Sequence, residues 1–202
     1  MQVVAVVPLD KRRSKVLVDE DFAFVLYKGE LRRYHIEEGG ELSQEQYEEI
    51  LQQVLNKRAK ERALYLLKAS DKTTGEIRRK LQEGFYPQEA IEFALEFLEK
   101  YHLVDDMDYG RRYIEAYKDR RSKKRLQFDL QQKGLDRQQI SELLESAEVS
   151  EDEQIQAFLQ KKGYPSGEMP LKERGKLVSA LCRKGFSYDA IYRAMGDMSD
   201  WD

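Results

Sequence analysis

The property that most constrains this chain is an internal repeat of about fifty residues, carried by apolar positions. Five apolar residues recur 49 residues later and again after a further 51, with no gap inside any copy. The three sets are Ile77, Leu81, Tyr86, Ile91 and Leu95; Leu126, Leu130, Leu135, Ile140 and Leu144; and Leu177, Leu181, Phe186, Ile191 and Met195. Any two amphipathic helices joined by glycine share part of this pattern, but three copies in one register favour true repetition.

Each copy is preceded by one more helical stretch, so the repeating unit is a three-helix module. These stretches are residues 55–68, 107–120 and 151–162. A module of this size buries little surface alone, so stacking on a neighbour should supply much of its stability. The sequence therefore predicts a mainly α fold: an elongated array of three tandem three-helix repeats with a small N-terminal antiparallel β segment. Such an array leaves one long face open to a partner.

Local signals place the helix boundaries of the first module. Ser43 with Gln46, and Thr73 with Glu76, have the spacing of capping boxes, which satisfy free backbone amides at a helix start. Gly84 is expected to end the helix that contains Ile77 and Leu81. In the second and third copies the glycine of the turn stands one place later, at positions 134 and 185.

The first forty residues have a different pattern. Residues 3–7, 15–18 and 22–27 are β-branched or aromatic runs, separated by turn-forming residues that include Lys28 and Gly29. We expect an antiparallel meander of two to four strands. Because so small a sheet is marginal by itself, it should pack on the helices or on a partner.

These patterns divide the chain into four parts. Residues 1–42 form the β-rich segment, and residues 43–104 form module 1 with its lead-in helix. Residues 105–148 form module 2, and residues 149–202 form module 3 with an acidic tail.

Charge and cysteine content bound the class of protein. The net charge of −3 argues against a polycation that coats nucleic acid, but residues 36–50 are strongly acidic and residues 111–125 strongly basic. The single cysteine, Cys182, allows no intramolecular disulfide and suits a reducing compartment. No apolar run approaches a membrane span, and the N-terminus lacks the pattern of a signal peptide. We therefore expect a cytoplasmic protein.

Several segments resemble the RecX family. Residues 69–77 are similar to its basic-Ser-x-x-Glu-Leu helix start, and residues 103–113 resemble its apolar pair, two Asp, aromatic and small residue. Arg125-Leu126, Leu130 and the Lys-Gly-apolar run at residues 133–135 also match. The resemblance covers residues 55–195, and the order of the motifs is more specific than any one of them.

Some positions depart from the family pattern. Gly110 stands where Ala is usual, Lys72 and Thr73 replace Arg and Ser, and module 3 carries an insertion at residues 163–167. The resemblance implies tandem three-helix repeats that bind along the groove of a RecA–single-stranded DNA filament. It further implies a monomeric negative regulator that blocks filament growth, ATP turnover and strand exchange in recombinational repair and the SOS response. Whether it also contacts the single-stranded DNA is left open.

Basic residues of module 2 and module 3 are the candidate partner-binding residues. They are Lys118, Arg120, Arg121, Lys123, Lys124, Arg125, Lys133, Arg183 and Lys184. Residues 118–125 hold six cations and one acidic residue, Asp119, which favours contact with an acidic recombinase surface or DNA phosphates, although charge runs are usually solvated. A weaker basic set in module 3 comprises Lys161, Lys162, Lys172, Arg174, Lys176, Arg183 and Lys184. Periodicity leaves open whether the two sets share a side.

Other candidate sites have simpler interpretations. Asp105, Asp106 and Asp108 are best explained as a helix start that complements the helix dipole. Tyrosines at positions 109, 113 and 117 have the spacing of a helix core stripe, although they could stack on bases. The sequence offers no catalytic constellation, phosphate loop or metal-ligand spacing, so we expect a non-enzyme without cofactor or metal.

The alternative is a regulator that binds duplex DNA directly, because paired helices with a glycine turn can imitate a helix-turn-helix. That alternative requires an exposed recognition helix, for which Gln138 and Gln139 are the best candidates. Modules 1 and 3 have no counterpart to these two residues.

Overall fold

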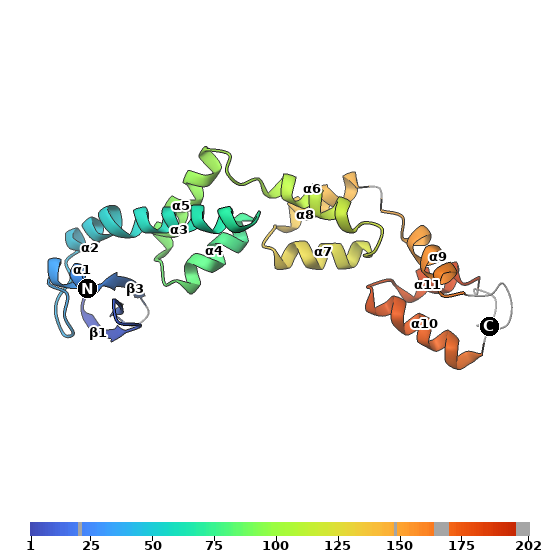
Figure 1. Cartoon of the computed structure of the whole chain (residues 1–202), viewed down its shortest axis with the longest axis horizontal. Coiled ribbons are helices and arrows are strands. Elements are labelled where there is room, and N and C mark those ends of the chain that lie inside the picture. Colours follow the sequence, from blue (N-terminus) through green and yellow to red (C-terminus); the bar gives the residue numbers. More distant parts are fainter. Residues whose placement is uncertain (20–21, 148, 164–169, 197–202) are drawn as a thin grey trace. The chain divides into compact units, whose positions relative to one another are not determined.

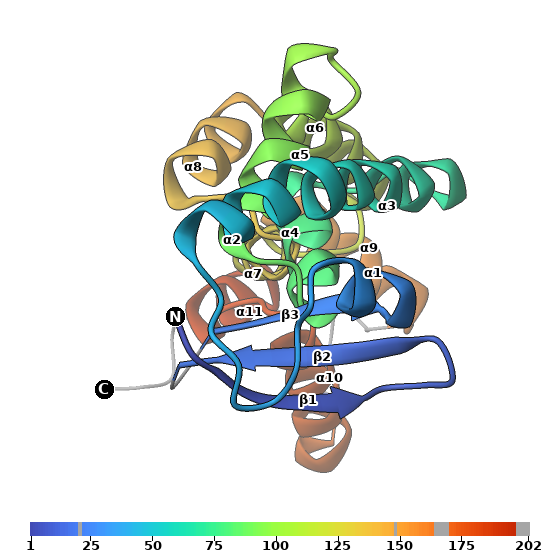
Figure 2. The same ribbon diagram turned by 90° about the vertical axis from the view of Figure 1, so that its left-hand side faces the viewer.

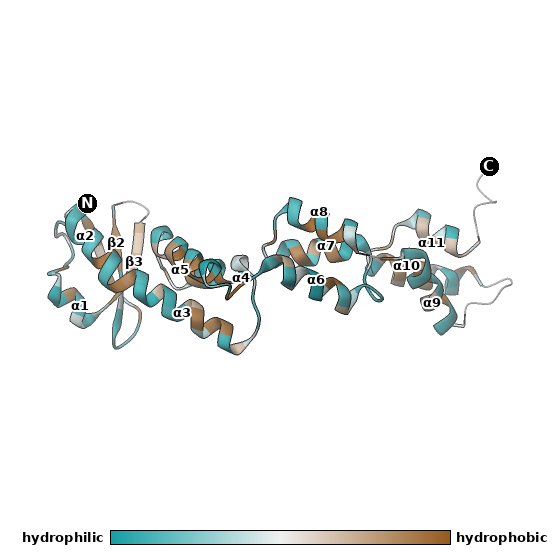
Figure 3. Cartoon of the chain, turned by 90° about the horizontal axis from the view of Figure 1, so that it is seen from above, coloured by the Kyte–Doolittle hydropathy of each residue, from teal (hydrophilic) through white to brown (hydrophobic). Residues whose placement is uncertain are grey.

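The computed structural model describes residues 1–19, 22–147, 149–163 and 170–196 (Figure 1). The chain forms two compact units, Met1–Asp105 and Asp106–Asp202. Most helices are amphipathic, with apolar and hydrophilic residues on different sides (Figure 3). Among the helices in the described part, none combines the length and hydropathy needed to cross a bilayer.

The first unit begins with the predicted antiparallel meander. Its strands are β1 (Val3–Pro8), β2 (Arg13–Val18) and β3 (Phe22–Tyr27), in the order β1-β2-β3. Val16 on the central strand lies opposite Val6 and Phe24. Helices α2 (Gln44–Ile50) and α3 (Asn56–Ala69) lie on one side of this sheet (Figure 2).

One short helix was not expected from the sequence. Lys28 and Gly29 have turn chemistry, yet Lys28 begins α1 (Lys28–Arg33) directly after β3. The backbone N–H of Tyr27 donates to Oε2 of Glu30 at 2.7 Å, which satisfies an amide at the helix start. The expectation of a simple turn here was wrong because this local cap favours a helix.

The lead-in helix runs into module 1 without a break. It comprises α2 (Gln44–Ile50), a π-helical turn, η1 (Leu51–Leu55), and α3 (Asn56–Ala69). The Ser43–Gln46 capping box is confirmed: Ser43 Oγ accepts the Gln46 N–H and Gln46 Oε1 accepts the Ser43 N–H, both at 3.1 Å. The Thr73–Glu76 box is confirmed in the same way.

Three three-helix modules follow one another along the chain, as the repeat predicted. Module 1 is α3, α4 (Thr74–Glu83) and α5 (Gln88–Lys100); module 2 is α6 (Asp106–Tyr117), α7 (Lys123–Gln132) and α8 (Arg137–Ser146); module 3 is α9 (Glu151–Lys161), α10 (Leu171–Arg183) and α11 (Tyr188–Ala194). All fifteen repeat positions are buried except Tyr86, Leu144 and Leu177, which are half-buried. Equivalent positions therefore have equivalent environments.

The turns inside the modules are equivalent as well. In each turn one N–H donates to a carbonyl five residues earlier: Tyr86 to Leu81 at 3.2 Å, Leu135 to Leu130 at 3.2 Å, and Phe186 to Leu181 at 3.3 Å. This is the long bond of a Schellman motif, which requires a left-handed residue just before the donor.

Glycine supplies that left-handed residue in two of the three turns. Gly134 and Gly185 both have a φ of +93°. In module 1 the equivalent residue is Phe85, with a φ of +57°, while Gly84 has a φ of −84°. Gly84 caps α4, but it does not supply the conformation for which glycine is suited. A non-glycine residue in the left-handed conformation, as Phe85 is, costs about 1–2 kcal/mol.

The cores differ between the two units. In the first unit one cluster includes both sheet residues, such as Phe24, and module 1 residues, such as Leu81. Modules 2 and 3 each have a cluster of their own. Gly110 of α6 allows close packing on α8, since a Cβ there would overlap Leu143. Residues 164–167 of the predicted insertion (163–167) and the acidic tail at residues 197–202 lie outside the described residues.

Candidate partner-binding site

The basic run joins α6 to α7 inside the second unit. Helix α6 ends at Tyr117, and Ser122 caps α7, accepting the Arg125 N–H on its Oγ at 3.2 Å. Ser122 is fully buried, so the junction is anchored at this point. The backbone that carries the cations on either side of Ser122 is therefore held in one position.

Arg121 is directed into module 2. Its Nη1 donates to Oη of Tyr113 and to Oδ2 of Asp129, both at 2.5 Å. The guanidinium carbon also lies 4.1 Å from the ring centroid of Tyr117. Burial raises the pKa of the Tyr113 phenol above its ordinary value, so the phenol stays neutral and accepts the bond. Arg121 therefore stabilises the module.

Three other candidate cations also contact their own module. Arg125 Nε lies 3.1 Å from Oδ1 of the same Asp129. Lys133 Nζ lies 5.1 Å from the ring centroid of Tyr109, and Lys118 Nζ pairs at 2.9 Å with a glutamate one turn earlier. These contacts hold the side chains on the module surface.

The remaining candidates have exposed side chains. They are Arg120, Lys123, Lys124, Arg183 and Lys184. Arg120 and Lys184 line one cleft of about 650 Å³ together with Lys161 and Lys162 of module 3. We call this the basic cleft. It brings part of the weaker basic set next to the stronger one, which periodicity had left open.

Polar contacts between modules 2 and 3 build the basic cleft. The side-chain amide of Gln154 donates to the Lys118 carbonyl, and the Lys123 N–H donates to Oε1 of Glu151 at 2.7 Å. Ser122 Oγ donates to the Lys184 carbonyl at 3.3 Å. These bonds hold α9 and the α10–α11 turn against the α6–α7 junction.

The close approach of that turn depends on glycine. A Cβ on Gly185 would lie 2.5 Å from Oγ of Ser122. The positive φ of Gly185 also disfavours any other residue. Gly185 therefore has two functions: it ends α10 and allows contact with module 2.

The electrostatics of the basic cleft suit an anionic partner. Four cations and one carboxylate, Asp119, line it, and Lys184 Nζ lies 5.6 Å from the ring centroid of Phe158. Within the described residues, Arg120, Lys161 and Lys162 form no ion pair. Buried Oε1 of Gln154, also at the cleft, has no hydrogen-bond partner there. The cleft thus offers cations that no carboxylate of the described residues neutralises.

The acidic residues of α6 and two of its three predicted core tyrosines have structural roles. Helix α6 begins at Asp106, and Asp108 Oδ2 accepts from Nε of Arg112 at 2.8 Å. This placement agrees with a helix start. Tyr113 and Tyr117 pack against the core of module 2.

The candidate recognition residues of a helix-turn-helix are not both available. Oε1 of Gln139 accepts the Asp136 N–H at 3.0 Å, and Asp136 Oδ1 accepts the Gln139 N–H at 2.8 Å. Gln139 is therefore part of the α8 capping box. Gln138 remains as a single exposed amide.

Comparison with family models identifies two of the three modules. Residues 59–98 match the model of the first three-helix domain of RecX, and residues 150–195 match that of the third. These ranges correspond to modules 1 and 3.

Whole-chain relatives agree with this match. The chain is 26% identical over 194 residues to "Regulatory protein RecX" of Clostridioides difficile (strain 630), covering 94% of this chain and 91% of that protein. It is 29% identical over 182 residues to the protein of the same name from Clostridium perfringens (strain SM101 / Type A), covering 88% and 85%.

Solved structures show the same fold. A crystal structure of regulatory protein RecX aligns with a TM-score of 0.58 at 23% identity, covering 96% of this chain and 98% of that one. RecX from Lactobacillus salivarius aligns with a TM-score of 0.58 at 22% identity, covering 70% and 94%. Two domain models, whole-chain relatives and solved structures thus all relate this chain of three-helix modules to the RecX family of regulatory proteins.

Proposed function

We propose that this protein is a non-catalytic negative regulator of the RecA recombinase. It binds the RecA–single-stranded DNA filament and inhibits ATP hydrolysis, filament growth and strand exchange in recombinational repair and the SOS response. The proposal rests on the match of modules 1 and 3 to two RecX domain models. Whole-chain relatives named as regulatory proteins support it. We further propose that it acts as a cytoplasmic monomer.

The basic cleft is the proposed contact surface. Its four cations, with the exposed Lys123 and Lys124 nearby in the sequence, offer charge to an acidic recombinase surface or to DNA phosphates. A filament presents the same surface at every protomer, so several modules can bind at once. Linked contacts of this kind raise the affinity for a filament above that for a free subunit.

The structure narrows the set of residues to be tested. Arg121 and Arg125 bind Asp129, so their replacement would disturb module 2 itself. The role of Gln139 in a capping box also weakens the alternative of a duplex-reading helix. Exposed cations of the basic cleft are the better test.

The proposal is tested by ATP hydrolysis. This protein is titrated into the cognate recombinase with single-stranded DNA and ATP. We expect hydrolysis to fall at micromolar ratios. Full hydrolysis at a tenfold excess of this protein over recombinase would reject the proposal.

A charge-reversal pair tests the basic cleft. The double variant Lys161→Glu/Lys162→Glu should raise the concentration for half-inhibition at least about tenfold, because like charges then oppose the partner. The matched control is Lys172→Glu/Lys176→Glu, which makes the same charge change on exposed α10 positions outside the cleft. Equal loss in both doubles would contradict a role specific to the cleft.

A further inference from the structure

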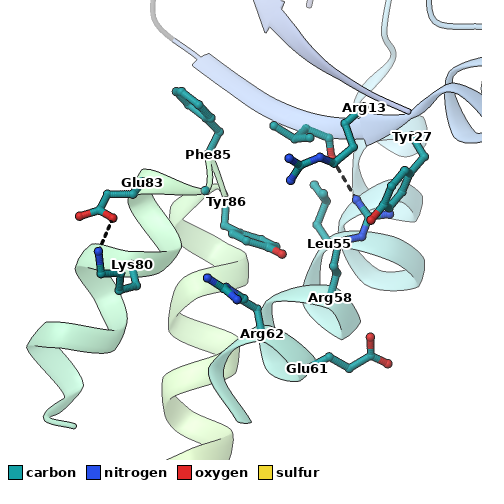
Figure 4. Close-up of a pocket in the computed structure, with 12 residues that line it drawn as sticks. Arg13, Tyr27, Leu55, Arg58, Glu61, Arg62, Lys80, Glu83, Phe85 and Tyr86 are labelled. Atoms are coloured by element: carbon teal, nitrogen blue, oxygen red, sulfur yellow. Dashed lines mark hydrogen bonds and ion pairs between the residues drawn. The ribbon is translucent and has the colours of Figure 1, made fainter. Parts of the chain in front are cut away.

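A second cleft lies within the first unit, between the sheet, α3 and the α4–α5 turn (Figure 4). Its volume is about 620 Å³. The residues used below are Arg13 from β2, Arg58 and Arg62 from α3, and Phe85 and Tyr86 from the turn; the carboxylates Glu61 and Glu83 also line the cleft. Arg13, Arg62 and Tyr86 face one space, and Phe85 lies at its edge and points away from Tyr86 (Figure 4). We call this space the aromatic cleft.

Two of the three arginines already have acidic partners. Arg13 Nε pairs with Oδ2 of Asp10 at 2.7 Å. Arg58 Nη2 pairs with Oε1 of Glu30 at 2.5 Å, and its Nη1 donates to the Val25 carbonyl at 3.2 Å. Arg58 is therefore a structural residue, whereas Arg13 still faces the cleft from the start of β2 (Figure 4).

Arg62 is the cation with capacity for a ligand. Its side chain is exposed and points toward Tyr86 (Figure 4). Within the described part of the chain it forms no hydrogen bond or ion pair; its guanidinium carbon lies 5.3 Å from the Tyr65 ring centroid. A guanidinium in this state can bind a phosphate through two parallel hydrogen bonds.

Phe85 occupies its position against the preference of its backbone. The equivalent residues of the other two modules are glycines, and Phe85 takes the left-handed conformation that they adopt. Phe85 remains 38% exposed, so part of its ring is accessible to a ligand. Lys15 Nζ lies 4.2 Å from its ring centroid. The ring is thus held at the cleft with a cation beside it.

We propose that the aromatic cleft binds single-stranded nucleic acid, with one phosphate at Arg62 and Arg13 and the adjacent base stacked on Phe85. Bases stack on aromatic side chains irrespective of sequence, and arginine binds the backbone beside them. An acidic peptide would use the arginines, but it would give the exposed ring nothing to stack on. The proposal does not depend on the recombinase, so it can fail while the proposed function stands.

The test measures binding of a fluorescent twelve-nucleotide oligo(dT) to the full-length protein by anisotropy, without recombinase. Phe85→Gly is the decisive variant, because glycine suits this turn and the fold should keep or gain stability. We expect its affinity for oligo(dT) to fall at least about fivefold, as loss of one stacking partner implies. Unchanged affinity would overturn the proposal, as would wild-type protein that does not bind oligo(dT).

Charge variants on α3 provide a second test of binding at the aromatic cleft. Arg62→Glu should weaken binding at least about tenfold, whereas Lys57→Glu, an exposed position on the same helix outside the cleft, should not. Equal weakening by both variants would show diffuse attraction and overturn the site. One phosphate contact also predicts about a 2.6-fold loss of affinity between about 50 and about 200 mM salt.

Competition separates nucleic acid from other anions. Unlabelled oligo(dT) should displace the probe, while poly-glutamate and inorganic phosphate at matched charge should not. Displacement by poly-glutamate as effective as that by oligo(dT) would reassign the cleft to acidic peptides and overturn the proposal.

Discussion

Module 1 and the pair formed by modules 2 and 3 use the same three-helix repeat with different neighbours. Module 1 shares a single apolar core with the β-sheet. Modules 2 and 3 keep separate cores and contact each other through hydrogen bonds around Ser122. The same three-helix repeat can therefore pack on its neighbour either through a shared apolar core or through hydrogen bonds. The stability of these two kinds of contact should respond differently to mutation.

The largest effect is expected in the shared core. Phe24→Ala removes a fully buried ring of β3 and should lower the free energy of unfolding by about 3–5 kcal/mol. Because module 1 packs on the same cluster, amide exchange in α3, α4 and α5 should accelerate together with exchange in the sheet. Denaturant unfolding and hydrogen exchange measure both results. Unchanged protection of α4 would show that module 1 is stable without the sheet.

The polar junction should be sensitive to a single methyl group. Gly185→Ala combines an unfavourable positive φ with overlap of Ser122, and should destabilise the second unit by about 2 kcal/mol. Gly175→Ala is the matched control, since a Cβ there meets nothing within 4 Å. Because residue 175 lies within α10, Gly175→Ala should raise the free energy of unfolding by about 0.5–1 kcal/mol. If both variants shifted thermal unfolding equally, close approach at Ser122 would be unimportant.

A smaller effect is expected at the arginine directed into module 2. Arg121→Gln leaves Asp129, which is 9% exposed, with Arg125 as its remaining partner. Loss of the charged hydrogen bonds should cost about 1–2 kcal/mol. The exposed neighbour Arg120 is the control: Arg120→Gln should change stability by less than about 0.5 kcal/mol. If urea unfolding showed that Arg120→Gln lowers stability more than Arg121→Gln does, the structural role given to Arg121 would be contradicted.

The smallest effect concerns the β1–β2 turn and pH. The backbone N–H of Arg12 and the side chain of Arg13 lower the pKa of Asp10 from 3.8 to about 2. Since the folded-state pKa is lowered, this stabilisation is present above pH 3.8 and is lost as the pH falls through about 2. Amide protection in the hairpin should be constant from neutral pH to mildly acidic pH, then weaken. The variant Asp10→Asn should lack this pH dependence; if it retained the dependence, another group would be responsible.

Periodicity predicted the helices because apolar spacing reflects burial directly. Ile77, Leu126 and Leu181 are buried at the positions that the repeat assigns to them. It could not predict Phe85 in a left-handed conformation, because composition there pointed to Gly84 instead. The conformation follows from the Schellman bond, which is a property of the backbone.

The candidate site was predicted in part. Arg120 and Lys184 were identified from charge, but their meeting with Lys161 and Lys162 depends on tertiary contacts around Ser122. Charge alone also placed Arg121 among the partner-binding residues, since a linear pattern does not show that Asp129 lies beside it.

The central claim is that this chain regulates recombination by binding a recombinase filament. The most direct measurement is co-sedimentation with preformed RecA filaments on single-stranded DNA, held with a non-hydrolysable ATP analogue. We predict saturable recovery of this protein in the filament pellet, and much less recovery of the Lys161→Glu/Lys162→Glu variant. If the wild-type protein stayed in the supernatant at micromolar filament concentrations, the claim would be contradicted.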